Sequence, residues 1–280
     1  MSHAADPAVG AQADGAPGEA AHEDAAPVLV LAATAFELEP LRERLRDAQA
    51  TEGPWDAVWL GRLGRTPVAL AVTGIGKVNA AAGLTLNAAV QRPRAVVQVG
   101  IGGAYLGSFL SNGMVAAASE ELQLDLGLRR PDHEVDPLDT MGFAATPERA
   151  GRPQRFNRVP THAGLQEALG AGLGLPLLRF ATLDAITADV ERGAALQRAF
   201  DVSIESMEGA AAAQVADRLG LPFAEVRGVS NLVGERDKRL WDVRGAITAS
   251  CRAVRALIEG WDDHPATQAM RGSAVPEHAW

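Results

Sequence analysis

The stretch from Ser203 to Asp237 constrains the fold most, because it contains a strand, a helix and a second strand in succession. Met207-Glu208-Gly209 marks the turn into a helix over 210–219, a segment rich in strong helix formers. Gly220 stops this helix, and the apolar run 223–229 is predicted to be a strand parallel to the first. The stretch therefore predicts a βαβ unit within an α/β fold.

Glu208 is the unusual residue of this unit, because it stands beside Met207 in a largely apolar setting. Burying an unpartnered carboxylate is costly, so Glu208 requires a partner. Two hydroxyl donors can bind one carboxylate at the same time, which suits the vicinal hydroxyls of a ribose. An acidic residue can also stabilise a helix N-terminus, and this stretch alone leaves both interpretations open.

Length and composition predict one domain with a short tail at each end. A chain of 280 residues that is 47% hydrophobic can bury one large core, expected over 27–261. The first 26 residues contain no apolar run, so burial cannot offset the entropy lost on ordering, and we expect a disordered tail. The segment 262–280 is expected to be a frayed C-terminal tail.

Several classes of function are disfavoured by composition. No run has the length and hydrophobicity of a signal or membrane segment, so a cytoplasmic protein without a membrane partner is expected. A single cysteine, Cys251, and six scattered histidines predict no metal site, and no cofactor is expected. A net charge of −9 argues against nucleic acid as a partner. A small molecule is the better prediction.

A second carboxylate follows the first buried strand. Residues 28–32 form a continuous apolar run typical of a central parallel strand, and Glu37 lies just beyond its carboxyl end. Ligands bind at that edge of open α/β sheets. An amphipathic helix is predicted over 38–45, and Glu37 and Glu39 are too close in sequence to share one of its faces. Two solvated carboxylates at a helix start are the alternative.

Two glycine-rich segments follow further predicted strands. A hairpin is predicted from 55–61 and 67–72, and the loop after it, 73–79, matches neither a Walker A loop nor a dinucleotide fingerprint. Its glycines are therefore interpreted as a tight turn into a helix over 79–90. The second segment, 100–104, follows a strand at 95–99 and either brings backbone close to a ligand or forms a simple turn.

The rest of the chain is predicted to alternate strands, helices and one irregular region. The predicted elements are a strand at 113–119, a mostly irregular segment at 120–143, a helix at 161–170, a strand at 175–181 followed by a loop at 182–189, and a closing helix at 243–258. Together these elements predict a single-domain α/β fold in which helices flank a mixed central sheet.

Two motifs carry a family resemblance. Residues 206–210, SMEGA, and 227–237, RGVSNLVGERD, resemble the nucleoside phosphorylase and nucleosidase superfamily, and within it the futalosine hydrolases of menaquinone biosynthesis. The irregular loop around 138–143 is more similar to futalosine hydrolases than to nucleosidases of thioether nucleosides. The resemblance implies a nucleoside phosphorylase-like fold, a catalytic Glu37, and substrate-binding roles for Gly102, Ile186, Met207, Glu208 and Ser230.

The chemistry expected from this resemblance is cleavage of the bond between ribose and a purine. Glu37 would activate water, and Glu208 would hold the 2′ and 3′ hydroxyls. Ser230, Asn231 and Asp237 would then face the base. Nucleosidases of adenine nucleosides carry Asp where this chain has Asn231, and an amide cannot act as an acid, which favours a 6-oxopurine such as hypoxanthine. Asp237 either donates a proton or pairs with Arg236 or Arg239.

Three functions compete at this point. An irreversible futalosine nucleosidase is preferred over a methylthioadenosine/adenosylhomocysteine nucleosidase, and over a purine nucleoside phosphorylase, which needs a cationic phosphate cradle. A non-catalytic nucleoside-binding protein is the third possibility, and the presence of both Glu37 and Glu208 argues against it. The resemblance also implies a homodimer or a larger homo-oligomer.

Overall fold

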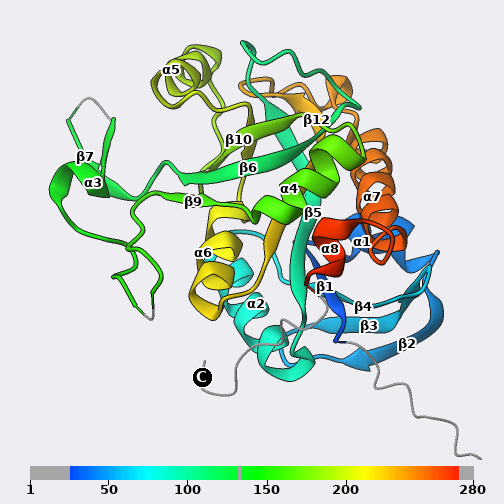
Figure 1. Cartoon of the computed structure of the whole chain (residues 1–280). Coiled ribbons are helices and arrows are strands. Elements are labelled where there is room, and N and C mark those ends of the chain that lie inside the picture. The colour runs from blue at the N-terminus through cyan, green and yellow to red at the C-terminus, as the bar shows by residue number, and fades with distance from the viewer. Residues whose placement is uncertain (1–25, 132–133, 150, 271–280) are drawn as a thin grey trace, which may run out of the picture.

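Strand β1 (Val28–Ala32) lies inside the central sheet, hydrogen-bonded in parallel to β4 on one side and to β5 on the other. All five of its residues are buried, as the continuous apolar run predicts. Val28, Val30 and Ala32 face one hydrophobic cluster, which also contains residues of α1 and α7. Leu29 and Leu31 face a second cluster with residues of α2 and α6. The strand therefore sits between two helical layers (Figure 1).

The computed structural model describes residues 26–131, 134–149 and 151–270. Its strands are β1 (Val28–Ala32), β2 (Arg46–Glu52), β3 (Ala57–Leu63), β4 (Thr66–Val72), β5 (Ala95–Ala104), β6 (Val115–Gln123), β7 (Gly127–Arg129), β8 (Val135–Pro137), β9 (Arg158–Pro160), β10 (Leu177–Thr182), β11 (Ile204–Ser206) and β12 (Phe223–Leu232). Its helices are α1 (Ala35–Arg42), α2 (Lys77–Gln91), α3 (Leu138–Met141), α4 (Ala163–Glu167), α5 (Val190–Phe200), α6 (Gly209–Leu219), α7 (Val243–Glu259) and α8 (Pro265–Gln268), with a π-helical turn at Ala168–Gly172 and a 3-10 turn at Lys238–Leu240. The predicted N-terminal tail, apart from Ala26, lies outside the described residues.

The main sheet of the described residues has ten strands in the order β11-β10-β6-β12-β5-β1-β4-β3-β2, with β9 paired to β6. Strand β11 also pairs with β5, so five of these strands close into a ring. Parallel and antiparallel pairs both occur, which confirms the predicted mixed central sheet flanked by helices. Among the described residues, no helix is long and apolar enough to cross a membrane.

The predicted parallel βαβ unit is wrong in one respect. Strand β11, helix α6 and strand β12 are all present, but β11 pairs antiparallel with β5, whereas β12 pairs parallel with it. The two strands that flank α6 therefore run in opposite directions. Strand β11 has three residues and takes its direction from β10 and β5, which lie outside the stretch that the prediction used.

The glycine-rich segment 100–104 is strand rather than loop, which corrects a second prediction. It forms the end of β5 and stays paired with β12, with a bulge between Val229 and Asn231. A Cβ on Gly100 would stand 2.6 Å from both Glu37 Oε1 and Arg227 Nη1. Glycine thus lets the strand run between these side chains, the close backbone approach that the prediction also considered.

Most other predicted elements are confirmed within a few residues: the β3–β4 hairpin, α2, β6, α4, β10 and α7. Strand β2 had no prediction because its seven residues are all exposed and carry no apolar pattern. Helix α5 also had no prediction from the sequence. The segment predicted to be irregular, 120–143, contains the end of β6 and a small excursion of β7, β8 and α3 that projects from the main sheet (Figure 1).

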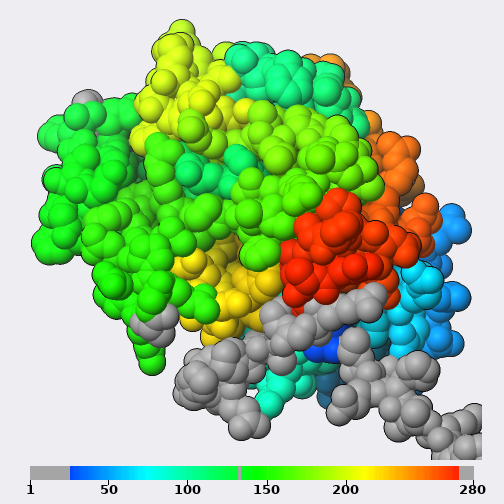
Figure 2. All heavy atoms as spheres, in the orientation of Figure 1, coloured from blue at the N-terminus to red at the C-terminus, as the bar shows by residue number. Residues whose placement is uncertain are grey.

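The segment after Trp261 differs from the expected frayed tail. Helix α8 packs on α4, and Thr267 and Met270 are buried there. Figure 2 shows this red segment against the green region that contains α4. Thr267 donates hydrogen bonds to the carbonyls of Trp261 and His264, which anchors the turn. Residues 271–280 lie outside the described part of the chain.

Candidate active site

A cavity of about 340 Å³ opens where β1, β5 and β12 end, a size typical of small-molecule sites. Its wall includes seven of the eight residues predicted from sequence: Glu37, Gly102, Ile186, Met207, Glu208, Ser230 and Asn231. The eighth, Asp237, is not part of this wall. Apolar side chains, including Phe36, Ile75 and Trp241, supply much of the remaining surface. The cavity therefore combines an apolar wall with a few polar groups.

Glu37 is fixed at the start of α1, which begins at Ala35 rather than at residue 38 as predicted. The reason is a capping box: the Thr34 hydroxyl accepts from the Glu37 amide, and Glu37 Oε2 accepts from the Thr34 amide and hydroxyl at 3.0 Å. Glu37 Oε1 accepts from the Ile101 amide at 3.2 Å. Glu39 is exposed on the helix surface. Of the two carboxylates, Glu37 is thus the one in the cavity.

Burial raises the pKa of Glu37 above its ordinary value. The nearby Arg227 guanidinium opposes this shift, and the Glu208 carboxylate adds to it. A raised pKa makes the ionised carboxylate a stronger proton acceptor than an exposed glutamate. Glu37 is therefore suited to take a proton from a water molecule or a hydroxyl in the cavity.

Glu208 has an ion-pair partner, which the sequence interpretation did not identify. Its Oε2 accepts from Arg227 Nη2 at 3.0 Å, and its Oε1 accepts from the Gly76 amide at 3.1 Å. It is the N-cap residue of α6 but makes no side-chain hydrogen bond to the helix, so its hydrogen-bond partners are Arg227 and Gly76. Each carboxylate oxygen keeps one acceptor position, and these positions remain for a ligand.

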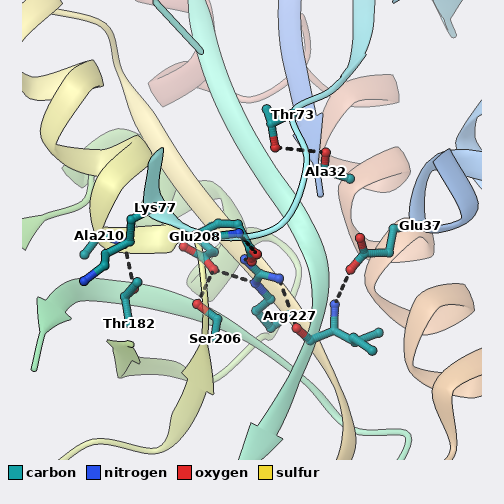
Figure 3. A network of polar contacts seen from close by, with 12 residues as sticks. Ala32, Glu37, Thr73, Lys77, Thr182, Ser206, Glu208, Ala210 and Arg227 are labelled. Atoms are coloured by element: carbon teal, nitrogen blue, oxygen red, sulfur yellow. Dashed lines mark hydrogen bonds and ion pairs between the residues drawn. The ribbon is translucent and has the colours of Figure 1, made fainter. Parts of the chain in front are cut away.

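Arg227 lies between the two cavity carboxylates (Figure 3). It is 1% exposed, and its three nitrogens are all engaged: Nε donates to Glu225 Oε1 at 2.5 Å, Nη1 to the Ile101 carbonyl at 3.0 Å, and Nη2 to Glu208. Burial alone would lower the pKa of Arg227, but Glu225 and Glu208 raise it. A buried arginine in an apolar strand, two residues after a glutamate, was the sequence signal for this network.

A buried carboxyl pair stands behind Arg227. Glu121 and Glu225 are fully buried, and a Cβ on Gly209 would collide with Oε2 of both. Burial, together with the adjacent Glu225, raises the pKa of Glu121 well above its ordinary value. The raised pKa favours the protonated form of Glu121, and Glu225 Oε1 is the oxygen that accepts from Arg227.

On the other side of the cavity, Asn231 is held in one orientation. The Ser230 hydroxyl donates to Asn231 Oδ1 at 2.7 Å, and Asn231 Nδ2 donates to the Leu232 carbonyl at 2.9 Å. These bonds place the amide oxygen toward Ser230, so one Nδ2 hydrogen remains for a ligand. Ser230 occupies one of the two acceptor positions of the amide oxygen, so Asn231 keeps one donor and one acceptor position.

Asp237 lies outside the cavity wall, which corrects its placement among the catalytic residues. Its two oxygens accept from Arg239 at 2.6 to 3.1 Å, and it caps the 3-10 turn that follows. These hydrogen bonds lower the pKa of Asp237, so it is a poor proton donor at neutral pH. Of the two roles considered from sequence, the structure shows the ion pair with Arg239.

Lys77 joins two segments at the rim of the site. Its Nζ lies 2.6 Å from Asp125 Oδ1 and 3.2 Å from Asp184 Oδ2, and its amide donates to Asp184 Oδ1. These contacts tie the start of α2 to the loop 182–189. Ile186 of that loop lines the cavity, and 43% of its surface is exposed. This exposure is consistent with a position at the cavity entrance.

Comparisons with known proteins agree on one family. The sequence matches the family model of the phosphorylase superfamily over residues 27–259. It is 40% identical over 186 residues to a futalosine hydrolase of Thermus thermophilus, which covers 66% of this chain and 79% of the relative. A futalosine hydrolase of Streptomyces coelicolor is 32% identical over 84% of this chain and 98% of its own.

A 5′-methylthioadenosine/S-adenosylhomocysteine nucleosidase of Haemophilus ducreyi is 28% identical over 72% of this chain and 84% of its own length. Among solved structures, the enzyme of the same name from Neisseria meningitidis, in complex with methylthio-immucillin-A, superposes with a TM-score of 0.71. It shares 26% sequence identity, and the match covers 84% of this chain and 99% of that one. The fold and the sequence thus agree.

Proposed function

The chain belongs to the phosphorylase superfamily, and from this membership we propose that it hydrolyses the N-glycosidic bond of futalosine, releasing hypoxanthine and dehypoxanthine futalosine. The observation that carries the proposal is the pair of buried carboxylates, Glu37 and Glu208, on one cavity with Arg227 between them. Hydrolysis of this bond needs one carboxylate for water and one for the sugar, which is the division of labour found in inverting glycoside hydrolysis.

Glu37 activates the attacking water. A water oxygen forms the new bond to C1′ while one of its protons passes to the Glu37 carboxylate. The electron pair of the bond between C1′ and N9 leaves with the purine, and the ribosyl group passes through an oxocarbenium-like transition state. The apolar side chains of the wall lower the polarity around Glu37, which strengthens its electrostatic contribution.

Glu208 binds the sugar through its 2′ and 3′ hydroxyls. Its oxygens are held in place by Arg227 and the Gly76 amide, so they need little reorganisation when the hydroxyls arrive. A second negative charge near C1′ also stabilises positive charge that develops on the ribosyl group. The ion pair with Arg227 compensates for the burial of this carboxylate.

Asn231 serves the departing base. Its free Nδ2 hydrogen donates to N7 or O6 of hypoxanthine and so stabilises the negative charge that develops on the purine. An amide cannot transfer a proton, and Asp237 lies outside the cavity, so the base takes its proton from water. This arrangement fits hypoxanthine, whose acceptor edge spans N7 and O6, better than adenine.

A phosphorylase is the second candidate, and the charge of the cavity disfavours it. Among the described residues that line the cavity, the cations are Arg227 and Arg236. Two carboxylates already bind Arg227, and Arg236 stacks over the Trp241 ring at 5.3 Å. Phosphate binding needs free donors or cations near C1′. The cavity wall therefore favours water over phosphate as the group that attacks C1′.

The proposal includes the setting of the reaction. We place the protein in the cytoplasm as a homodimer or larger homo-oligomer, acting in menaquinone biosynthesis. The test is to incubate the purified protein with futalosine, aminofutalosine and methylthioadenosine, with and without phosphate, and to quantify the free base. Phosphate-independent release of hypoxanthine is expected. Phosphate-dependent release would identify a phosphorylase, and the absence of any turnover would identify a binding protein.

A further inference from the structure

Glu205 is a buried carboxylate on the cavity wall for which the mechanism above has no role. Its side chain is 5% exposed, and it belongs to β11, the strand that closes the ring against β5. None of the hydrogen bonds of Glu205 comes from Arg227, and Glu205 lines the same cavity as Asn231. A carboxylate in this place requires donors, and the structure shows which groups supply them.

The donors of Glu205 come from two residues. Tyr105 donates its hydroxyl to Oε2 at 2.9 Å, and Thr187 donates its hydroxyl to Oε2 at 2.7 Å. The Thr187 amide donates to Oε1 at 2.7 Å. Thr187 also lines the cavity, but its backbone N–H already donates to Glu205 and is not free for a ligand. This part of the wall therefore presents an acceptor to a ligand, because Oε1 keeps one acceptor position.

The sheet register places Glu205 in line with Asn231. Gly103 is the register partner of both residues, Glu205 on β11 and Asn231 on β12. Residues directly opposite one another on paired strands project to the same face of a sheet. A Cβ on Gly103 would stand 3.4 Å from Asn231 Nδ2, so the glycine keeps a side chain away from the amide. Asn231, Gly103 and Glu205 all line the cavity, and along this line Asn231 supplies a donor and Glu205 an acceptor.

We propose that Glu205 is a specificity-determining residue that accepts the N1–H of a 6-oxopurine, while Asn231 donates to N7 or O6 of the same base. The proposal rests on the function proposed above. A 6-oxopurine carries acceptors at N7 and O6 and then a donor at N1, which complements the order of groups along this line. A 6-aminopurine has a lone pair at N1, and that lone pair would face the Glu205 carboxylate.

Glu205→Gln tests the assignment with little change of shape. The glutamine oxygen can accept from the Tyr105 and Thr187 hydroxyls at the Oε2 position, while the NH2 group takes the Oε1 position, offers the cavity a donor and gives up the bond from the Thr187 amide. We expect the ratio of kcat/KM for futalosine to that for aminofutalosine to fall by about tenfold, because a charge-assisted hydrogen bond to N1–H is replaced by a neutral group that suits an unprotonated N1. An unchanged ratio overturns the proposal.

Binding of the free bases provides a readout that does not depend on turnover. Calorimetric Kd values for hypoxanthine and adenine should favour hypoxanthine in the wild type, and Glu205→Gln should reduce that preference about tenfold. If the wild type cleaves neither nucleoside but still prefers hypoxanthine through Glu205, the proposed reaction fails while the base assignment stands. If it cleaves futalosine and Glu205→Gln leaves both ratios unchanged, only the base assignment fails.

Tyr105→Phe is the matched control, because it removes one donor from Glu205 and leaves the carboxylate in place. Tyr105 is fully buried, so we expect a lower Tm from the lost hydrogen bond to Glu205 Oε2, which keeps its bond from Thr187, while the ratio for the two bases stays near that of the wild type. A shift of the ratio as large as that of Glu205→Gln would assign the effect to packing around β11 and overturn the proposal.

Discussion

Arg227 Nη2 lies 3.0 Å from Glu208 Oε2, and both side chains are almost completely buried. On its other edge the same guanidinium binds Glu225 Oε1 at 2.5 Å. Glu208 lines the cavity and Glu225 does not. Glu225 therefore supports the arginine that holds Glu208 without lining the cavity itself, and the two glutamates can be compared as a pair.

Glu208→Gln and Glu225→Gln should separate sugar binding from ion-pair support. Each removes one carboxylate from Arg227, so both should lower the Tm. Glu208→Gln should also weaken the bonds to the diol, at about 1.5 to 3 kcal/mol for each charge-assisted bond, and should therefore harm a ribosyl substrate more than its 2′-deoxy analogue. Glu225→Gln should harm both substrates to the same degree. The measurement is kcat/KM for the two substrates with each variant, and equal losses in Glu208→Gln would refute the diol assignment.

Glu37→Gln should slow hydrolysis by about 10² to 10⁴, the usual contribution of a positioned base, and leave nucleoside affinity nearly intact. The glutamine oxygen can keep the bonds from the Thr34 amide and hydroxyl, so α1 should stay capped, whereas the NH2 group replaces the oxygen that accepts from the Ile101 amide. Single-turnover kinetics together with a separate Kd measurement distinguish the two effects. A collapse of affinity with normal turnover of bound substrate would show that Glu37 is not the base.

The pH dependence of kcat/KM should show the raised pKa of Glu37. A base must be ionised, so activity should fall as the pH drops through the pKa of Glu37. Because burial raises that pKa, the midpoint of the acid limb should lie above 4.5, the ordinary value for a glutamate. The residual activity of Glu37→Gln should lack this limb. An acid limb that stays in the variant would assign the titration to another group.

Asn231→Asp should move the specificity from hypoxanthine toward adenine nucleosides. One oxygen of the new carboxyl would accept from Ser230, and the other would face the Leu232 carbonyl, where only a protonated oxygen is tolerated. The protonated group can turn its one proton from the Leu232 carbonyl to N7, whereas the ionised group repels O6. The kcat/KM ratio of futalosine to aminofutalosine should change toward aminofutalosine by about tenfold or more, as a penalty of about 1 to 3 kcal/mol implies. A ratio that moves the other way would contradict the role of Asn231.

Glu121→Gln should remove a pH-dependent loss of stability. The folded state raises the pKa of Glu121, so it binds that proton more tightly than the unfolded state does. The resulting stability is fully present below the unfolded pKa and is lost as the pH rises through the folded pKa. Glutamine does not titrate, so the Tm of the variant relative to the wild type should increase from pH 4.5 upward. Glu120→Gln is the control, because the adjacent Glu120 is partly exposed and pairs with Arg158.

The sequence predicted the element types and most of the cavity residues, because apolar runs, helix stops and polar residues after strands are local signals. Glu37 and Glu208 follow strands in this way, and both line the cavity. The direction of β11 relative to β12 was wrong, because it depends on pairing with strands that lie far away in the sequence. Local patterns contain no information about such pairing.

The site residues that the sequence did not predict were missed for the same reason. Arg227, Glu205 and Glu121 stand inside predicted or neighbouring strands, where a charged residue in a short segment gives no indication of its partner. Their partners come from other strands and loops, as with Thr187 for Glu205 and Glu208 for Arg227. Asp237 was placed in the site by its nearness to Asn231 in the sequence, whereas its side chain turns to Arg239.

The pairing of β11 with β5 has a consequence for the order of folding. Tyr105 and Glu205, which meet where the ring closes, are 100 residues apart in the chain. Contacts of such long range require a large loop to close first, so they form slowly. The wall of the cavity therefore cannot exist in a nascent chain that ends before β11, and the recovery of activity after dilution from denaturant reports the completion of the ring rather than the formation of the first strands.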